Sequence, residues 1–506
     1  MPPADKGPLN PGTEFDPTAG GHGSLVRSWG AHWDTDPERP CLFFAGGRAI
    51  RYGELEAASR RAAGRLHGAG LIPGDRVLIS AASSAELVIA HVACLRGGWV
   101  VVPANTAYRQ AELAHLMADA RPRAAIVDDP QRGRWIRDQD KSIQVFSPDL
   151  PLADAPAPEL DTADPMDPAL IGYTSGTTGQ PKGAVLSHAN LLASVEALRL
   201  AWRWTPQDRL VLTLPLFHMH GLGVGLHGTL HAGASAVVLP GFEPNAVFEA
   251  IADHEASLFF GVPTLYHRLV ESARVGELSR LRLCISGSAP LPAELHTRFE
   301  SLTGQRIVER YGMTETVMLA SNPVDGERRP GTVGLPLPGV EIRLAGDPAE
   351  IEVRGANVFA GYWERPEANT EAFRDDGFFR TGDLGQLDDA GYLVISGRAR
   401  ELLISGGYNV YPREVEEALA EHTGIAECAV VGTPSAEWGD SITAYVVAQT
   451  GAEITAEAIR SFLAQRLAPY KHPRLVHCIE ALPRNALGKV QKHRLEAGRV
   501  LDEDPA

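Results

Sequence analysis

The chain has 506 residues, 44% of them hydrophobic and 22% charged, with a formal net charge of −16. This length exceeds what one ordinary hydrophobic core supports, so we expect at least two domains. The acidic surplus argues against a nucleic-acid partner, which would need basic residues to neutralise its phosphates. The most apolar stretches, such as residues 87–94, are too short to span a bilayer, so no membrane partner is expected.

The five cysteines show neither zinc-ligand nor disulfide spacing, which is typical of a reducing compartment. The N-terminus has no basic-then-apolar signal pattern. We therefore expect a cytoplasmic protein, and the sequence shows no obligatory protein partner. Residues 1–23 are rich in Pro, Gly and Asp and are predicted to form a disordered tail.

Order is expected from Ser24, where residues 24–33 have the pattern of an amphipathic helix. Residues 76–98 predict a strand, a turn and a helix, and residues 98–105 and 122–129 each predict a further strand. Apolar strands alternating with Ala- and Leu-rich helices are typical of βαβ units and a largely parallel sheet.

A glycine- and hydroxyl-rich segment, YTSGTTGQPKG at 173–183, lies between two apolar strands. Its glycine N–H groups, its hydroxyls and Lys182 suit a polyphosphate. Gln-Pro-Lys-Gly follows Gly179, so this is not a Walker loop. By composition alone, a flexible turn is an equally good interpretation. A helix from about Asn190, as its cap, to Trp202 is expected next.

After residue 330 the pattern changes to short strands separated by turn residues, which predicts an all-β subdomain. Mixed α/β patterning returns from about residue 400, with a helix predicted over 455–468. We place a boundary at 397–401 and expect a small C-terminal domain after it.

Residues 217–231 contain two patterns that invite other interpretations. Residues 223–228 spell Gly-x-Gly-x-x-Gly, but a dinucleotide site would need a preceding strand and a suitably spaced acid. His227 and His231 are four residues apart, without a cysteine or acidic partner in the pattern that a metal site would favour. A glycine-rich helix packed closely against a pocket is the better interpretation.

Eight motifs follow one another in the order of a known family. They are 173–183, SGSAPL (286–291), RYGMTET (310–316), GYW (361–363), RTGDLG (380–385), GR (397–398), GGYNVYPREVE (406–416) and LPRNALGK (482–489). Over residues 25–495 the chain resembles the adenylate-forming superfamily, which includes acyl-CoA synthetases, luciferases and adenylation domains.

The resemblance implies an α/β fold with three parts. A large N-terminal domain, 24–398, would contain parallel-type α/β subdomains and a small β-barrel-like subdomain. Residues 399–401 would form a hinge, and 402–506 a small mobile α+β lid domain.

The resemblance also implies a reaction, in which a carboxylate attacks the α-phosphate of ATP and expels pyrophosphate. Because both reactants are anions, the site needs donors, positive charge and a metal. Thr174 and Glu315 would hold Mg²⁺, Asp383 in a turn would bind the ribose, and Lys489 would bind the attacking carboxylate and the α-phosphate. The residues implied in ATP binding are Thr174, Ser175, Gly176, Thr177, Thr178, Gly179, Lys182, Ser288, Ala289, Glu309, Arg310, Tyr311, Gly312, Met313, Thr314, Asp383, Arg398 and Lys489.

In the family, a second step follows rotation of the C-terminal domain, which withdraws the lysine and admits the thiol of CoA. The implied hinge residue is Arg400, where the family more often has Lys or Asp. The implied CoA contacts are Ser405, Gly406, Gly407 and Tyr408. His218 corresponds to the gate between the acid site and the thiol tunnel.

The segments that would line the acid pocket carry small and polar side chains. They include His218, Met219, His220, Thr264, Arg282 and Ser286. This set suits a short acid with a second charge, which Arg282 could bind; a structural role for Arg282 is the alternative. LPLFHMHGL and LRLCISGSAPL resemble malonyl-CoA synthetases, which act on malonate and often methylmalonate.

Three other functions stay open at this point. The chain could activate a short- or medium-chain fatty acid or an aryl acid, or load an acyl group onto a carrier protein. A carrier-loading enzyme would often sit beside a carrier domain, and none follows Lys489 here. An inactive scaffold would be expected to have lost Lys489, Glu315 or Asp383, all of which are present.

Overall fold

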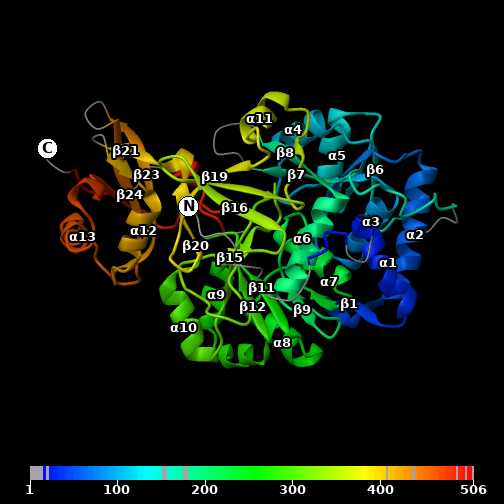
Figure 1. Cartoon of the computed structure of the whole chain (residues 1–506), viewed down its shortest axis with the longest axis horizontal. Coiled ribbons are helices and arrows are strands. Elements are labelled where there is room, and N and C mark those ends of the chain that lie inside the picture. The colour runs from blue at the N-terminus through cyan, green and yellow to red at the C-terminus, as the bar shows by residue number, and fades with distance from the viewer. Residues whose placement is uncertain are drawn as a thin grey trace. The chain divides into compact units, whose positions relative to one another are not determined.

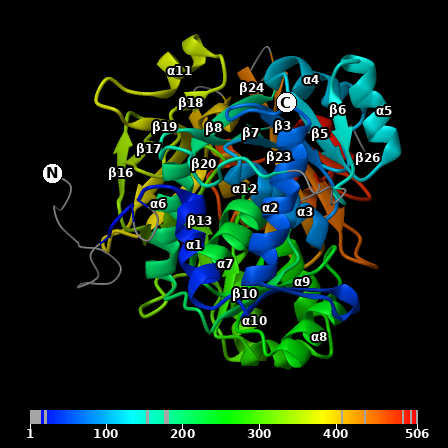
Figure 2. The ribbon, with the colours of Figure 1, turned by 90° about the vertical axis from the view of Figure 1, so that its right-hand side faces the viewer.

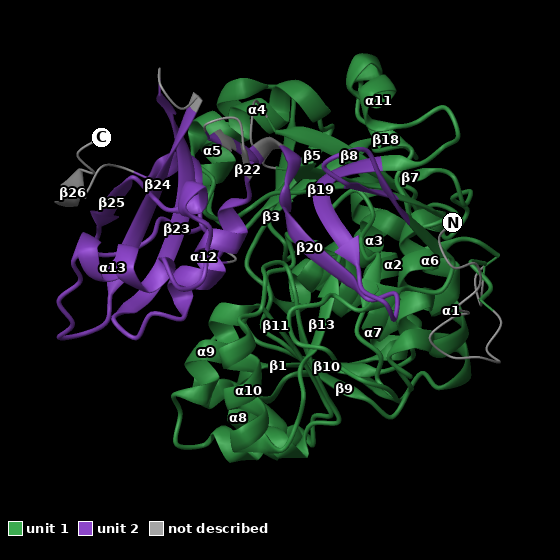
Figure 3. Ribbon diagram, turned by 60° about the vertical axis from the view of Figure 1, so that its left-hand side comes forward, with its two compact units in different colours: residues 1–342, 353–379 green, residues 343–352, 380–506 purple. Residues whose placement is uncertain are grey.

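The computed structural model describes residues 15–18, 22–150, 156–174, 181–405, 408–435, 439–485, 488–495 and 499–503. The chain forms two compact units (Figure 3): unit 1 comprises residues 1–342 and 353–379, and unit 2 comprises 343–352 and 380–506. The division after Phe379 precedes the boundary expected at 397–401, so residues 380–398 group with the C-terminal part. Most of the predicted N-terminal tail lies outside the described residues.

The first sheet of unit 1 has nine strands in the order β15-β14-β13-β12-β11-β9-β10-β1-β2, of which Figure 1 labels β1, β9, β11, β12 and β15. Its strands are β1 (Pro40–Phe44), β2 (Ala49–Arg51), β9 (Arg209–Leu212), β10 (Ser235–Val238), β11 (Leu258–Gly261), β12 (Leu283–Ser286), β13 (Val308–Tyr311), β14 (Ala320–Ser321) and β15 (Leu335–Pro336). From β13 across to β1 the neighbouring strands pair in parallel. The carboxyl ends of these strands therefore meet at one edge, where open α/β sheets bind ligands.

The second sheet of unit 1 has seven strands in the order β18-β8-β7-β4-β3-β5-β6. Its strands are β3 (Arg76–Ser80), β4 (Val100–Pro103), β5 (Ala124–Val127), β6 (Gln144–Phe146), β7 (Pro168–Thr174), β8 (Lys182–Ser187) and β18 (Gly361–Tyr362). The strands predicted within 76–98, 98–105 and 122–129 are confirmed as β3, β4 and β5, which pair in parallel. β7 and β8 form an antiparallel pair with Thr174 opposite Lys182.

The described helices of unit 1 flank these sheets, and α2 packs against α3 (Figure 2). They are α1 (Leu25–Thr35), α2 (Tyr52–Gly68), α3 (Ala85–Arg96), α4 (Gln110–Ala120), α5 (Pro130–Gln139), α6 (His188–Ala201), α7 (His227–His231), α8 (Pro244–His254), α9 (Pro263–Val270), α10 (Ala293–Thr303) and α11 (Pro366–Ala372), with the short turns η1 (Ala45–Gly47), η2 (His220–Leu226) and η3 (Val275–Arg280). The predicted Asn190 cap is wrong. Ser187 caps α6 by accepting from the Asn190 N–H at 3.1 Å, and the Asn190 side chain accepts from the Ser187 N–H in return.

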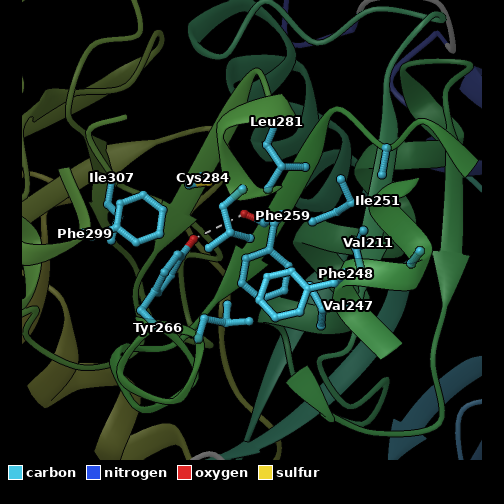
Figure 4. Close-up of a cluster of buried hydrophobic side chains, with 14 of the residues drawn as sticks. Val211, Val247, Phe248, Ile251, Phe259, Tyr266, Leu281, Cys284, Phe299 and Ile307 are labelled. Atoms are coloured by element: carbon cyan, nitrogen blue, oxygen red, sulfur yellow. Dashed lines mark hydrogen bonds between the residues drawn. The ribbon is translucent and has the colours of Figure 1, made fainter. Parts of the chain in front are cut away.

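A core of aromatic and aliphatic side chains joins the first sheet to α8, α9 and α10 (Figure 4). Phe248, Phe259 and Phe299 are fully buried in it, and each such side chain contributes about 1.5–3 kcal/mol by leaving water. The hydroxyl of Tyr266 donates to the carbonyl oxygens of Ile285 at 2.9 Å and Phe259 at 3.4 Å. These bonds fix α9 beside the carboxyl ends of β11 and β12.

The described residues of unit 2 combine strands with α-helices, which agrees with the predicted mixed C-terminal part. A four-stranded sheet, in the order β16-β17-β19-β20, represents the predicted β subdomain, and residues 340–342, 353–355 and 379 of its strands belong to unit 1. The elements are β16 (Val340–Ala345), β17 (Glu350–Gly355), β19 (Phe379–Leu387), β20 (Leu393–Arg398), η4 (Ala399–Glu401), β21 (Leu403–Ser405), β22 (Tyr408–Val410), α12 (Pro412–Ala420), β23 (Ile425–Ser435), β24 (Gly439–Ala448), α13 (Ala456–Leu463), η5 (Pro469–Lys471), β25 (Leu475–Cys478), η6 (Lys492–Arg494) and β26 (Arg499–Glu503).

The second sheet of unit 2, built from β21 to β26, packs its apolar residues with those of α12 and α13. Together the two units have the α/β fold that the sequence predicts. Among the described residues, no helix combines the length and the apolar character that crossing a membrane requires.

Candidate active site

Polar residues gather at the carboxyl ends of the parallel strands of unit 1. The segment 217–220 follows β9, Thr264 follows β11, the segment 286–288 ends β12, and Arg310 lies near the end of β13. Because these strands are neighbours in one parallel sheet, residues distant in sequence reach the same edge.

Arg310 is the most unusual of these residues. It is only 5% exposed, and two of its guanidinium nitrogens, Nε and Nη2, have no hydrogen-bond partner among the described residues. A Cβ on Gly287 would lie 2.4 Å from Arg310 Nε, so Gly287 makes room for this side chain. Burial lowers the pKa of Arg310 to about 9, which still leaves it charged at neutral pH. A buried cation with unsatisfied donors is a strong indication of an anionic ligand.

Three further polar residues lie with Arg310. The Nδ1 atom of His220 is 3.3 Å from Ser288 Oγ, while His220 Nε2 has no partner among the described residues. Burial, and then the charge of Arg310, hold the pKa of His220 well below its usual value, so the imidazole is neutral. The hydroxyl of Ser286 is buried and likewise has no partner in the described part of the chain. We call Arg310, His220, Ser286 and Ser288 the acid subsite; the sequence placed Arg310 among the ATP contacts, and that contact stays a prediction.

Arg282 does not belong to this subsite. Its guanidinium donates to both carboxylate oxygens of Asp208, at 3.0 and 2.9 Å, and to the Trp202 carbonyl at 3.0 Å. It precedes β12, at the end of the strand opposite to Ser286. This pairing contradicts the prediction that Arg282 binds a second carboxylate and supports the structural alternative.

The other residues predicted to contact the acid lie near the subsite. His218 is half-buried, and its Nδ1 accepts from the His220 N–H at 3.4 Å. Met219 is buried, and its methyl group fills the space over Gly223, where a Cβ would lie 2.2 Å from it. Thr264 is half-buried in the first turn of α9. Their contact with an acid stays a prediction.

The glycine-rich segment after His218 is a packing element. It forms the π-helix η2 followed by α7, as the helical interpretation predicts. A Cβ on Gly221 would lie 2.4 Å from the Pro215 carbonyl oxygen, and one on Gly228 would lie 2.5 Å from the Trp204 ring. Glycine is therefore required here because neighbouring backbone and ring atoms leave no room for a Cβ. The Gly-x-Gly-x-x-Gly pattern is explained by this packing, without a dinucleotide site.

The nearby histidines also have structural partners. The Nε2 atoms of His227 and His91 are 2.8 Å apart, and His231 Nε2 is 2.9 Å from a carboxylate oxygen of Glu196. In the described residues, no cluster of three or more His, Cys, Asp or Glu side chains could hold a metal.

A second group of residues surrounds Tyr362, which belongs to the GYW motif. Its hydroxyl donates to Glu315 Oε1 at 3.0 Å, and Lys182 Nζ lies 5.3 Å from the centre of its ring. Glu315 is 4% exposed and lies in a turn that follows β13. A Cβ on Gly172 would lie 2.5 Å from the Thr314 methyl, so this turn packs directly on β7, the strand that ends in Thr174. Tyr362 belongs to the GYW motif, but sequence reasoning assigned it no role of its own.

Carboxylate and hydroxyl oxygens are the ligands that Mg²⁺ prefers. Glu315 and Thr174, the last residue of β7, supply both types, so these residues fit the predicted metal. Ser175, Gly176, Thr177, Thr178 and Gly179 lie outside the described residues.

Glu309 and Gly312, which flank Arg310 in the sequence, stabilise the packing at this edge of the sheet. Glu309 Oε1 accepts from the Leu291 N–H at 3.1 Å, which ties segment 286–291 to β13. A Cβ on Gly312 would lie 2.2 Å from the Val317 carbonyl oxygen, so only glycine fits there. Ser288, Ala289, Tyr311 and Met313 lie along the same edge, and their contacts with ATP stay predictions.

In unit 2, Asp383 and Arg398 lie opposite each other on β19 and β20 and form an ion pair of 3.1 Å. Asp383 therefore lies within a strand, which corrects the predicted turn. Lys489 belongs to the same electrostatic neighbourhood. Although Lys489 is exposed to solvent, the protein atoms around its ammonium, and then the charge of Arg398, lower the pKa of Lys489, while Asp383 and Glu401 oppose this shift.

The residues predicted for CoA and for the hinge are only partly described. Ser405 is buried, and its hydroxyl accepts from Arg474 Nη1 at 3.0 Å. Gly406 and Gly407 lie outside the described residues, as do the side chains of Tyr408 and Arg400. Arg400 lies in η4.

Residues 30–363 match the model of the AMP-binding enzyme family, and residues 414–489 match that of the AMP-binding enzyme C-terminal domain. The chain belongs to the AMP-binding enzyme family. ATP-bound MatB from Rhodopseudomonas palustris is a similar solved structure, at 41% identity and a TM-score of 0.88 over 93% of this chain and 98% of that one.

Curated members of the family are similar along most of their length. A malonate–CoA ligase of Arabidopsis thaliana is 34% identical over 516 residues, covering 89% of this chain and 85% of the relative. A sulfoacetate–CoA ligase of Cupriavidus necator is 36% identical over 499 residues, covering 93% and 96%. The chain is accordingly an enzyme of the acid–CoA ligase class. Since these relatives are named for different acids, the acid depends on the residues of its own pocket.

Proposed function

We propose that this enzyme joins malonate, and also methylmalonate, to CoA, with ATP converted to AMP and pyrophosphate through an acyl-adenylate. The observation that carries the proposal is the buried guanidinium of Arg310, whose Nε and Nη2 lack partners among the described residues. Malonate has one carboxylate to activate and a second one to satisfy this cation.

The energetics favour a diacid over a fatty or aryl acid. An uncompensated buried charge costs several kcal/mol, and a carboxylate can accept two parallel hydrogen bonds from one guanidinium. The hydroxyl of Ser286 and the Nε2 of neutral His220 can complete the contacts of the second carboxylate. A fatty acid would leave all three groups unsatisfied, which is the basis of strong discrimination in polar binding sites.

The proposed first half-reaction brings the other carboxylate to the α-phosphate of ATP. Lys182, with the hydroxyls and N–H groups of segment 174–179, binds phosphate oxygens, while Asp383 and Arg398 bind the ribose. Lys489 neutralises the attacking carboxylate and the α-phosphate, because its ammonium carries the positive charge that both anions lack. Thr174 and Glu315 would hold Mg²⁺, which supplies charge stabilisation on the phosphates.

In the proposed second half-reaction, the CoA thiol displaces AMP. This step uses the segment Ser405–Tyr408 and the gate at His218, and it requires Lys489 to withdraw about the hinge at Arg400. The similarity to malonate–CoA ligases supports the proposal. The similarity to a sulfoacetate–CoA ligase is consistent with a second anionic group in the substrate, though with a different chemistry.

An acid panel tests the proposal. CoA-dependent AMP release should be measured with malonate, methylmalonate, sulfoacetate, monomethyl malonate, butyrate and benzoate. We expect malonate to exceed butyrate and monomethyl malonate in kcat/KM by roughly 10²- to 10⁴-fold. A preference for sulfoacetate would overturn the malonate assignment and retain the anion-binding role of Arg310. A preference for butyrate or benzoate would overturn both.

A further inference from the structure

The segment that carries Lys489 is a short antiparallel hairpin within unit 2. Arg484 pairs with Val490, the Asn485 N–H donates to the Lys489 carbonyl at 2.9 Å, and the Gln491 N–H donates to the Pro483 carbonyl at 2.7 Å. Its first arm is anchored to β23, because Arg484 Nη2 donates to Glu427 Oε1 at 2.8 Å.

Lys492 anchors the other arm. Its ammonium lies 2.8 Å from Glu416 Oε1 on α12 and 3.4 Å from Glu401 Oε2 in η4. The side chains of Lys492 and Glu416 are 23% and 22% exposed and that of Glu401 is 35% exposed, so this ion triad is partly buried. Glu416 Oε1 also accepts from the Val430 N–H at 2.7 Å, which orients the carboxylate independently of the lysine. Although burial opposes it, the carboxylates of Glu416 and then Glu401 raise the pKa of Lys492.

Glu401 connects this ion triad to Arg398 and Asp383, the residues proposed to bind the ribose. It ends η4, which directly follows β20, and β20 ends in Arg398, the partner of Asp383. The Lys492–Glu401 pair therefore joins the hairpin of Lys489 to the strand pair of Asp383 and Arg398. Only two residues, Val490 and Gln491, separate Lys489 from Lys492, so a displacement of Lys492 is transmitted to Lys489 through very little chain.

We propose that Lys492 is a positioning residue that sets the location of Lys489 for acyl-adenylate formation, through its ion pairs with Glu401 and Glu416. The inference rests on the proposed role of Lys489 in the first half-reaction. Lys489 is a flexible side chain on a hairpin, and a misplacement of about 1 Å can cost roughly 100-fold in rate. Lys492 needs no contact with substrate to have this effect.

The test compares Lys492→Met, Lys492→Arg and Glu401→Gln with Lys471→Met. Lys471 is the matched control because it also pairs with a glutamate of α12, Glu414, at 2.5 Å, and belongs to η5 and not to the hairpin. Pyrophosphate release from ATP and malonate reports the first half-reaction, and thioester formation from synthetic malonyl-AMP and CoA reports the second. Melting temperatures report the fold.

We expect Lys492→Met to lower kcat of the first half-reaction by roughly 10- to 100-fold, with KM for ATP and malonate changed less than about 3-fold. Thioester formation should stay within about 2-fold of the parent rate. Lys492→Arg should recover most of the loss, Glu401→Gln should show a smaller loss of the same kind, and Lys471→Met should match the parent enzyme.

Equal losses in both half-reactions, or a first half-reaction unchanged in Lys492→Met, would overturn the inference. If Lys492→Met does not fold, the two half-reactions are measured in Glu401→Gln instead, because glutamine keeps the shape of the side chain. Equal losses, or an unchanged first half-reaction, in that variant would then overturn the inference. Failure of the parent enzyme to release pyrophosphate with every acid tested would instead refute the proposed function.

Discussion

Replacing Arg310 by Met should make the ligand-free protein more stable while abolishing its use of malonate. Burial lowers the pKa of Arg310 from 12.5 to about 9. At about 1.4 kcal/mol per pKa unit, holding this charge in the folded state costs on the order of 5 kcal/mol. This cost is fully present below pH 9 and disappears as pH rises toward the unfolded pKa, because the unfolded arginine stays protonated throughout that range. Allowing for imperfect packing of the new side chain, we expect a net gain of about 1–4 kcal/mol at pH 7.

Arg282→Met is the matched control, since it removes the arginine that precedes the neighbouring strand β12, and the opposite effect on stability is expected. Its guanidinium pairs with Asp208, and its side chain is 36% exposed. Removing it should therefore destabilise the protein by about 1–3 kcal/mol and leave malonate selectivity unchanged.

Urea denaturation at pH 7 without ligands measures both stabilities, and kcat/KM for malonate and butyrate measures selectivity. In Arg310→Met, kcat/KM for malonate should fall by at least about 100-fold, while kcat/KM for butyrate should not fall. A lower free energy of unfolding in Arg310→Met, or retained turnover of malonate, would refute the reasoning that this buried cation binds a substrate anion.

The remaining predictions concern Lys489, Tyr362 beside Glu315, and the buried His91. Lys489→Ala should abolish pyrophosphate release yet spare thioester formation from supplied malonyl-AMP, and equal loss of both would reject its assignment. Tyr362→Phe removes the hydrogen bond to Glu315 and should raise the Mg²⁺ concentration for half-maximal activity by roughly 3- to 30-fold, measured by metal titration with kcat compared at saturation; an unchanged titration would separate Tyr362 from the metal site. His91 is buried and neutral beside His227, with a pKa lowered by burial to about 3. Because the unfolded chain binds this proton below pH 6.5, His91 should contribute about 2 kcal/mol of destabilisation at pH 5 relative to pH 7, and His91→Gln should show a correspondingly smaller loss in urea midpoints.

The sequence by itself determined the alternation of strands and helices, the fold class and the family. Those features are local: hydrophobic periodicity, glycine requirements and motif order are properties of short segments. The strands predicted at 76–98, 98–105 and 122–129 appear as β3, β4 and β5 for this reason. The Asn190 cap was misplaced because Ser187 and Asn190 both carry cap-forming side chains, and only the backbone geometry selects between them.

Only the tertiary structure decided which arginine is available to a substrate. Arg282 and Arg310 lie at opposite ends of adjacent strands, and nothing local to either shows that Asp208, 74 residues away, satisfies the first. The same holds for the contact of Tyr362 with Glu315, which are 47 residues apart. Burial and pairing depend on neighbours that only the folded chain supplies. A side chain's chemistry can be named from its sequence, whereas its freedom to bind another molecule depends on what the fold has already placed beside it.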